Sequence, residues 1–309
     1  MGLRVEVPSS LGPAGLSFGN LGISVEEFRV VIEVVDADCK GVETEFEAGL
    51  GQEHARMAAE IVKRVFESLS GSYDVKGGAK VIVHSVIPPD KGLGFAEALS
   101  LAACYGLALR SKAELTDAEI LAIASMAVGG GGWDHLTASY YGGFTWVNAV
   151  AEPPTVIRID PPDWLEVLLF VPRFGVSKWG ERLGVSSGRV YSYDDVSRVT
   201  SALSSLIQGL MNDDPEALRE GISSNPLNRR LEDAVPHFRT ISRVLEELGC
   251  LGLVASRSGP ALMALFDEHT TDLDYAYKRV VDELEKVRAP YDVRKATIGS
   301  GLSSSGVAI

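Results

Sequence analysis

The sequence predicts an α+β fold divided into two domains, and three observations lead to this prediction. The chain has 309 residues, whereas a typical domain has about 150. Apolar runs rich in Val, Ile and Phe are mixed with segments whose apolar residues recur at helical spacing. Two Pro-Pro pairs interrupt the strand-like runs near the middle of the chain. We therefore expect an N-terminal domain at 1–155 and a C-terminal domain at 156–309.

In the N-terminal half, strands and helices are expected in mixed order. The spacing Thr116-x-x-Glu119 is that of a capping box, so a helix should begin there and end before the four glycines at 129–132. A loop that ends at Gly94 should open another helix, and 8–22 should form a structured loop. The other expected elements are strands at 3–8, 26–35, 79–87, 142–150 and 155–159 and a helix at 52–69.

The C-terminal half is expected to be mostly helical from residue 194 onward. The apolar, β-branched runs predict strands at 164–172, 250–256, 261–267 and 291–298. Helical periodicity predicts helices at 194–212, 214–222, 232–249 and 271–287.

The composition excludes several classes of partner. The chain has 42 acidic and 29 basic residues, and the net charge of -13 would repel nucleic acid and anionic lipid. No apolar run reaches the length of a membrane span, and the N-terminus lacks a signal-peptide pattern. The three cysteines lie far apart without metal-binding spacing. We expect a cytoplasmic protein that binds neither nucleic acid nor membrane.

The segment IPPDKGLG (87–94) is the strongest candidate site. Its two glycines would let the backbone approach a ligand, and the following helix would present free N–H groups and its positive dipole end, which suits phosphate. The spacing matches neither the P-loop nor the dinucleotide-binding fingerprint. An ordinary strand-to-helix turn also explains the segment.

Two further segments carry polar groups beside glycines. In SRSGPALMALF, Ser256 and Ser258 are placed to hydrogen-bond a ligand at a tight corner, although a simple hairpin explains this segment equally well. In GGGGWDHLTASYYGG, Asp134 and His135 are candidate proton-transfer groups. The alternative for this pair is a turn and cap within a loop.

Together, and in this order, these segments resemble the GHMP kinase superfamily, which includes galactokinases, homoserine kinases, mevalonate kinases and phosphomevalonate kinases. VPSSLGPAGLSFGNLG (7–22) is similar to the first motif of the family, IPPDKGLG to its phosphate-binding second motif, and SRSGPALMALF to its third. The resemblance spans nearly the whole chain. It implies a two-lobed α+β structure with a nucleotide or phosphate cleft between the lobes.

The chain resembles more than one branch of the superfamily. The first motif and the VPHF segment resemble homoserine kinases, whereas LGISVEEFRVVIEV and PPDWLEVLLFVP resemble the archaeal β-ribofuranosylaminobenzene 5'-phosphate synthases, which use phosphoribosyl pyrophosphate instead of ATP. WDHLTASYYGG resembles part of the archaeal shikimate kinases, which places Asp134 near the catalytic aspartate of the mevalonate kinase branch. A further alternative, that the chain belongs to neither of the first two branches, is left open.

The resemblance implies a role for each matched residue. Asp134 would orient or deprotonate the acceptor hydroxyl, Lys91 would supply positive charge during the transfer, and Glu97 would help to hold Mg²⁺. The implied phosphate-binding residues are Gly92, Leu93, Gly94, Phe95, Ala96, Ser256, Ser258 and Gly259, and the implied acceptor-binding residues are Ser9, Ser10, His135 and Arg230.

The chain departs from the family pattern in two motifs. Where the second motif continues with serines that contact phosphate and Mg²⁺, this chain has Phe95, Ala96 and Glu97, so two hydroxyl ligands are missing. Glu97 would compete with phosphate for the N–H groups of the helix start unless Mg²⁺ bridges them. In the first motif, Pro13 and Gly19 stand where homoserine kinases have their substrate-binding Asn and Asp, which argues against homoserine as the acceptor.

Three functions are open from the sequence. The first is an ATP- and Mg²⁺-dependent kinase that phosphorylates a hydroxyl of a small metabolite. The second is a synthase of the β-ribofuranosylaminobenzene 5'-phosphate type that uses phosphoribosyl pyrophosphate and Mg²⁺. The third is a non-catalytic protein with a degenerate phosphate loop, which the apolar Phe95 favours. A homodimer is also left open.

Overall fold

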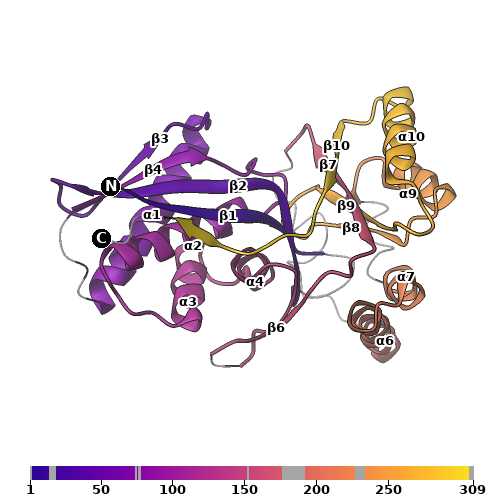
Figure 1. The fold of residues 1–309 in the computed structure, drawn as a ribbon, viewed down its shortest axis with the longest axis horizontal. Coiled ribbons are helices and arrows are strands. Elements are labelled where there is room, and N and C mark those ends of the chain that lie inside the picture. The colour runs from indigo at the N-terminus through magenta and orange to yellow at the C-terminus, as the bar shows by residue number, and fades with distance from the viewer. Residues whose placement is uncertain are drawn as a thin grey trace.

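The computed structural model describes residues 2–13, 19–73, 75, 78–151, 153–175, 192–226 and 234–305. These residues form two lobes, each built on one β-sheet with helices packed against it (Figure 1). The predicted two-lobed α+β class is confirmed.

The first lobe contains a mixed sheet and four helices. Its strands are β1 (Leu3–Leu11), β2 (Leu21–Ala37), β3 (Val42–Phe46), β4 (Gly78–Ser85), β5 (Phe144–Asn148), β6 (Thr155–Ile159) and β11 (Ser303–Ser305). Its helices are α1 (Gln52–Ser72), α2 (Phe95–Arg110), α3 (Asp117–Ala127) and α4 (Trp133–Tyr141). The strand order is β11-β1-β2-β4-β3, and β5 pairs with both β2 and β6.

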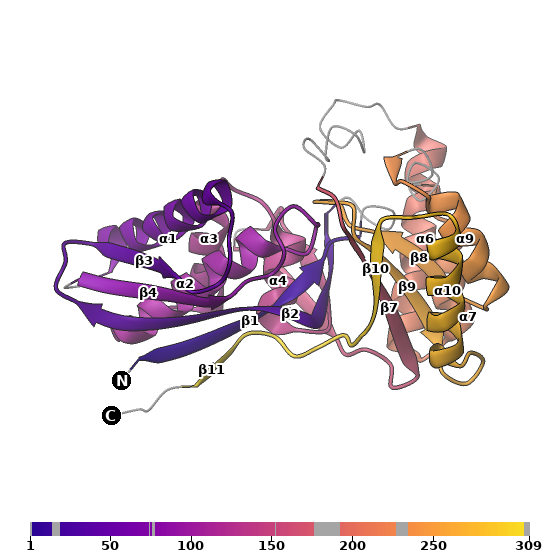
Figure 2. The same ribbon diagram turned by 90° about the horizontal axis from the view of Figure 1, so that it is seen from above.

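The four helices of the first lobe cover one face of its sheet (Figure 2). Helices α2 and α4 pack on β1 and β2, and α1 and α3 pack against α2. Helix α2 is buried on almost every side, which agrees with its run of Ala and Leu and with the absence of a polar face. The start of this central helix is therefore held firmly by its neighbours.

The second lobe contains an antiparallel sheet of four described strands and four helices. The strands are β7 (Leu165–Pro172), β8 (Gly252–Ala255), β9 (Leu262–Asp267) and β10 (Tyr291–Ala296), in the order β10-β7-β9-β8. The helices are α6 (Tyr193–Met211), α7 (Pro215–Ser223), α9 (Phe238–Glu247) and α10 (Leu273–Lys286). None of the helices in the described part of the chain is long and apolar enough to cross a membrane.

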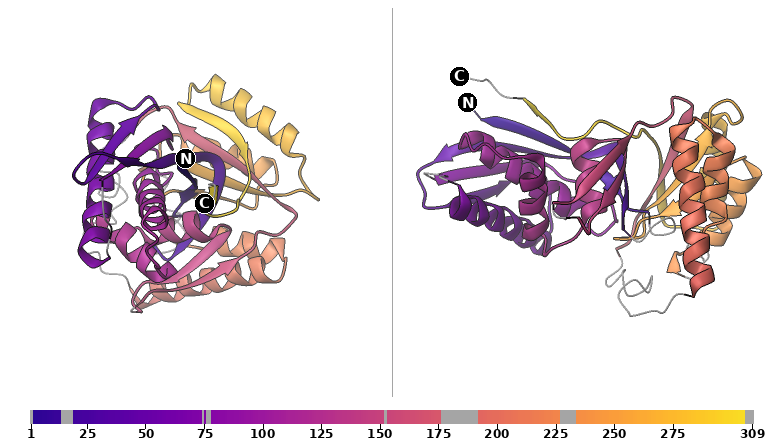
Figure 3. Two further views of the ribbon diagram at one scale, coloured as in Figure 1. Left: turned by 60° about the vertical axis from the view of Figure 1, so that its left-hand side comes forward. Right: turned by 90° about the horizontal axis from the view of Figure 1, so that it is seen from below.

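The last strand returns from the second lobe to the first (Figure 3). After β10, Thr297 accepts a hydrogen bond from the Glu26 N–H at 3.0 Å, and Gly299 accepts one from the Gly143 N–H at 2.9 Å. Strand β11 then pairs antiparallel with β1. The first lobe is therefore completed by residues 297–305. The domain boundary expected between 155 and 156 stays a prediction. Strand β6, which continues past that position, pairs with β5 in the sheet of the first lobe.

The structure differs from the sequence-based expectations in three places. The segment around Asp134 was expected as a loop, but α4 begins at Trp133, directly after the glycines. Strands β3 and β11 were not expected. The loop expected at 8–22 is shorter, because β1 continues through Leu11 and its Ser9 hydroxyl donates to the carbonyl of Val25 at 2.7 Å.

Candidate active site

The glycine loop that precedes α2 lies against the connection between β8 and β9. Gly92 has φ of 85°, and a Cβ placed there would lie 2.7 Å from the Cα of Gly259. The Ala261 N–H also donates to the carbonyl of Lys91 at 2.9 Å. Two segments far apart in sequence, one from each lobe, thus touch through their backbones, which only glycines allow.

The start of α2 is built to expose its backbone N–H groups. Gly94 is the N-cap residue with φ of 74°, and no side chain caps it. The first-turn N–H groups of a helix have no partners within the helix, and the dipole favours an anion there. A Cβ on Gly94 would lie 2.5 Å from Ser10 Oγ and 2.9 Å from His135 Nδ1, so the end of β1 and the start of α4 close in on this point.

Leu93 and Phe95 contribute backbone to this loop while their side chains belong to the core. Leu93 is 1 % exposed and Phe95 is 6 % exposed, and both pack within the hydrophobic core of the first lobe. The aromatic ring therefore does not lie over the loop. Its burial in the core accounts for an apolar residue at this position.

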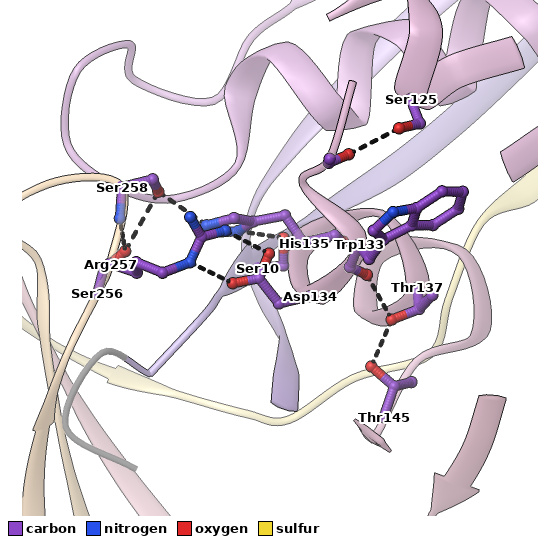
Figure 4. A network of polar contacts seen from close by, with 11 residues as sticks. Ser10, Ser125, Trp133, Asp134, His135, Thr137, Thr145, Ser256, Arg257 and Ser258 are labelled. Atoms are coloured by element: carbon purple, nitrogen blue, oxygen red, sulfur yellow. Dashed lines mark hydrogen bonds and ion pairs between the residues drawn. The ribbon is translucent and has the colours of Figure 1, made fainter. Parts of the chain in front are cut away.

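Asp134 forms a buried ion pair with Arg257 (Figure 4). Arg257 Nε donates to Asp134 Oδ2 at 3.0 Å, and Nη2 donates to Oδ1 at 2.7 Å. The Asp134 side chain is 1 % exposed and that of Arg257 28 %. Since Asp134 lies on α4 and Arg257 on the β8–β9 connection, this bidentate pair joins the two lobes.

The ion pair fixes the charge state of Asp134. Burial by itself would raise the pKa of Asp134, but electrostatic interactions with His135 and Arg257 and hydrogen bonds from both residues outweigh it, so the pKa lies below its usual value. Burial would likewise lower the pKa of Arg257, but Asp134 and then Glu97 raise it. A carboxylate in this state is a weak proton acceptor and a strong anchor for the guanidinium.

His135 connects a buried serine to an exposed one (Figure 4). Its Nδ1 lies 3.1 Å from Ser10 Oγ, and its Nε2 lies 2.7 Å from Ser258 Oγ. The Ser139 hydroxyl donates to Ser10 Oγ at 2.9 Å. Ser10, His135 and Ser139 are fully buried, whereas Ser258 is exposed.

The structure brings most of the sequence-predicted residues together, but not all in the expected way. Ser256 is buried, and its Oγ accepts from the Ser258 N–H at 3.2 Å. The Ser9 hydroxyl is used within the sheet and not in the site. Lys91 and Ala96 lie half-buried in the loop and at the start of α2. Arg230 lies outside the described residues.

Glu97 is the acidic residue in the first turn of α2. A Cβ on Gly132 would come within 3.1 Å of its Oε1. Among the residues described, no cluster of three or more His, Cys, Asp or Glu forms a metal site. Mg²⁺ commonly uses one or two carboxylates together with substrate phosphates and water, so this donor set fits Mg²⁺ that arrives with a nucleotide.

Sequence reasoning missed Arg257, Ser139 and Gly12. Arg257 was quoted within the third motif, but its partner Asp134 is 123 positions away, and no local pattern links them. Gly12 packs on the same carboxylate, since a Cβ there would lie 2.2 Å from Asp134 Oδ2. The available signal for this ion pair was an arginine among the Ser and Gly residues of a tight turn, because an arginine that is buried there needs an anionic partner.

Comparison with known proteins assigns the family. The model for the GHMP kinases N terminal domain matches residues 57–143, and the model for the GHMP kinases C terminal domain matches 206–280. The chain belongs to the GHMP kinase superfamily.

Curated relatives that match the chain include homoserine kinases. The enzyme of Pyrococcus abyssi is 26 % identical over 96 % of this chain and 98 % of its own length. That of Petrotoga mobilis is 24 % identical over 94 % of this chain and 91 % of its own length. That of Thermoplasma volcanium is 30 % identical, over 64 % of this chain and 65 % of its own length.

Solved structures show the same fold. A homoserine kinase from Cytophaga hutchinsonii has a TM-score of 0.83 at 18 % identity and covers 98 % of this chain and 97 % of its own. The mevalonate kinase of L. major, solved with R-mevalonate, has a TM-score of 0.73 at 18 % identity and covers 97 % of this chain and 96 % of its own.

Proposed function

We propose that this protein is an ATP-dependent kinase that transfers the γ-phosphoryl group to a hydroxyl of a small metabolite. The observation that carries the proposal is the convergence of three segments at the start of α2. Gly92 meets Gly259 of the β8–β9 connection, and Gly94 meets Ser10 and His135. The first N–H groups of α2 have no partner within the helix, and in this proposal they hold the phosphates where segments of both lobes meet.

In this proposal, backbone N–H groups bind the phosphates that serine hydroxyls contact in the family pattern. The N–H groups of Phe95 and Ala96 bind phosphate oxygens, and Lys91 contributes positive charge at the loop. Glu97 holds Mg²⁺, which when bound neutralises charge on the phosphates. Glu97 then no longer competes with phosphate for the helix start.

We propose that Asp134 orients Arg257 and does not remove a proton from the acceptor hydroxyl. Both of its carboxylate oxygens are taken by Arg257, and its pKa is lowered, so it is poorly suited to remove a proton. It holds the guanidinium of Arg257 beside the site, where a fixed cation stabilises charge on a transferring phosphoryl group.

The acceptor is proposed only as a small hydroxyl compound. The homoserine kinase relatives make homoserine the first compound to test. Pro13 and Gly19 replace two polar residues of the homoserine kinase motif, so hydroxy acids and isoprenoid alcohols belong in the same screen. Phe95 no longer favours a non-catalytic protein, because its ring packs in the core.

The test is calorimetric titration with Mg²⁺-ATP and, in parallel, with Mg²⁺-phosphoribosyl pyrophosphate. We expect the wild-type protein to bind ATP and Gly94→Ala to lose that binding, since the new Cβ would displace Ser10 and His135. Gly130→Ala is the matched control, because Gly130 also has a positive φ but no atom of the described structure beyond its chain neighbours lies within 4 Å of its Cβ position. Binding of the pyrophosphate alone would favour the synthase, and binding of neither compound would overturn both enzyme functions.

A further inference from the structure

Ser258 and His135 form a hydroxyl-imidazole pair that the proposed kinase reaction does not use. Ser258 Oγ lies 2.7 Å from His135 Nε2, at the end of the chain of contacts that begins at Ser139. Ser258 is exposed and His135 is 0 % exposed, so the serine is the only member of the four-residue chain that a ligand can reach directly. A nucleophile beside a buried base, which is itself held by a third group, is the arrangement that activates a hydroxyl.

The hydrogen bonds of Ser10 indicate which nitrogen of His135 carries the proton. The Ser10 hydroxyl donates its single hydrogen to the carbonyl of His135 at 3.3 Å and accepts from Ser139 at 2.9 Å. Its second lone pair is then available to accept from Nδ1 in the 3.1 Å contact. In the neutral tautomer with the proton on Nδ1, the lone pair of Nε2 faces the hydroxyl of Ser258, which is the orientation of a base.

The position of Ser258 places it at the phosphate site. The next residue, Gly259, packs so closely on the loop that a Cβ there would lie 2.3 Å from the Gly92 N. The guanidinium of the preceding residue, Arg257, is held by Asp134 and interacts electrostatically with Glu97 in the first turn of α2. A hydroxyl between these two residues thus has the phosphate-binding backbone on one side and a fixed positive charge on the other.

We propose that Ser258 is a self-phosphorylation site: in the absence of a small-molecule acceptor, it takes the γ-phosphoryl group of ATP bound to the same chain. Ser258 Oγ forms the new bond to the γ-phosphorus, the bond from that phosphorus to the β,γ-bridging oxygen breaks, and ADP leaves. The hydroxyl proton passes to His135 Nε2. The inference rests on the proposed function, because that function supplies the bound ATP.

The experiment incubates the full chain with Mg²⁺-ATP and no acceptor, and locates phosphate by tandem mass spectrometry. Trypsin cleaves after Arg257 and Lys278, so fragment ions of the peptide 258–278 distinguish Ser258 from Thr270 and Thr271. We expect phosphate on Ser258, at a rate per chain that does not depend on protein concentration.

Variants separate self-modification from other sources of phosphate. Ser258→Ala should abolish the label, whereas Ser201→Ala, an exposed serine on α6, should keep it. His135→Asn should slow the labelling about 100-fold by removing the base. Gly94→Ala should stay unlabelled, because it should not bind ATP. If His135→Asn does not fold, the site of the label in the wild-type protein and in Ser258→Ala still decides the question.

Calorimetry on the same samples separates this inference from the proposed function. ATP binding without phosphate on Ser258, or with phosphate only elsewhere, overturns the inference and leaves the kinase function standing. Label in Gly94→Ala identifies another kinase as the source, and a rate per chain that rises with protein concentration shows transfer between molecules. Either result also overturns the inference. Absence of ATP binding overturns both.

Discussion

Two glycine-rich segments precede helices in the first lobe: the phosphate loop, residues 92–94 before α2, and the tetraglycine turn, residues 129–132 before α4. Their glycines share positive φ values. A Cβ in the phosphate loop would lie 2.7 Å from Gly259 Cα or 2.5 Å from Ser10 Oγ. A Cβ at any of the first three glycines of the tetraglycine turn would have no heavy atom of the described chain within 4 Å, apart from the glycine itself and its chain neighbours.

The difference separates two reasons for a glycine. At the first three glycines of the tetraglycine turn only the positive φ requires glycine, because a side chain would meet open space, and the fourth, Gly132, faces the Glu97 side chain at 3.1 Å. In the phosphate loop the backbone of Gly259 and the side chains of Ser10 and His135 occupy the places where side chains would be. The tetraglycine turn has more glycines, but the closer approach of distant segments favours the phosphate loop as the candidate site.

The largest expected effect comes from removing the charge of Asp134, which links α4 to the β8–β9 connection through Arg257. Asp134→Asn leaves the guanidinium of Arg257 without its anion in a largely buried place. We expect a loss of about 3 to 5 kcal/mol in the free energy of unfolding, measured by urea denaturation. Asp194→Asn breaks an exposed ion pair with Arg198 and should change little. Equal losses would contradict the importance of the buried pair.

The next largest effect tests the contact between the lobes directly. Gly92→Ala adds a Cβ 2.7 Å from the backbone of Gly259 at a position with positive φ, so both strain and overlap oppose folding. We expect a loss of about 3 kcal/mol in unfolding free energy, together with loss of ATP binding. Gly71→Ala serves as the comparison, and a Gly92→Ala protein with unchanged stability would show that the two loops do not touch in solution.

A smaller effect is expected from acid. The folded pKa of Asp134 lies below its unfolded value of about 3.9, so the ion pair stabilises fully above that pH and progressively less as the pH falls through the folded pKa. Other carboxylates titrate in the same range, so the measurement is the difference in urea midpoint between the wild-type protein and Asp134→Asn. This difference should shrink from pH 7 to pH 3, and a constant difference would argue against an ionised Asp134.

The smallest effect belongs to the tetraglycine turn. Gly130→Ala meets no atom in the described structure but keeps φ at 87°, so only backbone strain opposes it. We expect a loss of about 1 to 2 kcal/mol in unfolding free energy and unchanged ATP affinity. Loss of ATP affinity would remove the distinction between the two segments.

The fold was more accessible from the sequence than the site. Strongly periodic elements such as α1 and capped ones such as α3 were predicted well, and the capping box of Thr116 and Glu119 is present. Helix α4 was missed because four glycines hide its start and it has only nine residues. β11, with three serines, has no apolar signal, because only its pairing with β1 makes it a strand.

The site depends on pairings that no local pattern encodes. The resemblance to a family pointed to Asp134 and to the serines of the third motif, but not to the arginine between them. The Arg257–Asp134 and Ser258–His135 contacts join residues on different lobes, both 123 positions apart. The sequence also left open whether the ring of Phe95 lies at the loop or packs inward, and the structure shows that it packs in the core.

The return of β11 to the first lobe has a consequence for how the chain is made. A ribosome delivers β1 and β2 long before residues 297–305, which cover the outer edge of β1 and bond to Glu26 and Gly143. Until the last segment emerges, that edge has unpaired backbone groups of the kind that recruit other strands. The sheet of the nascent first lobe therefore lacks its edge strand during translation. We expect a variant that lacks residues 303–305 to fold like the intact protein but to aggregate more readily.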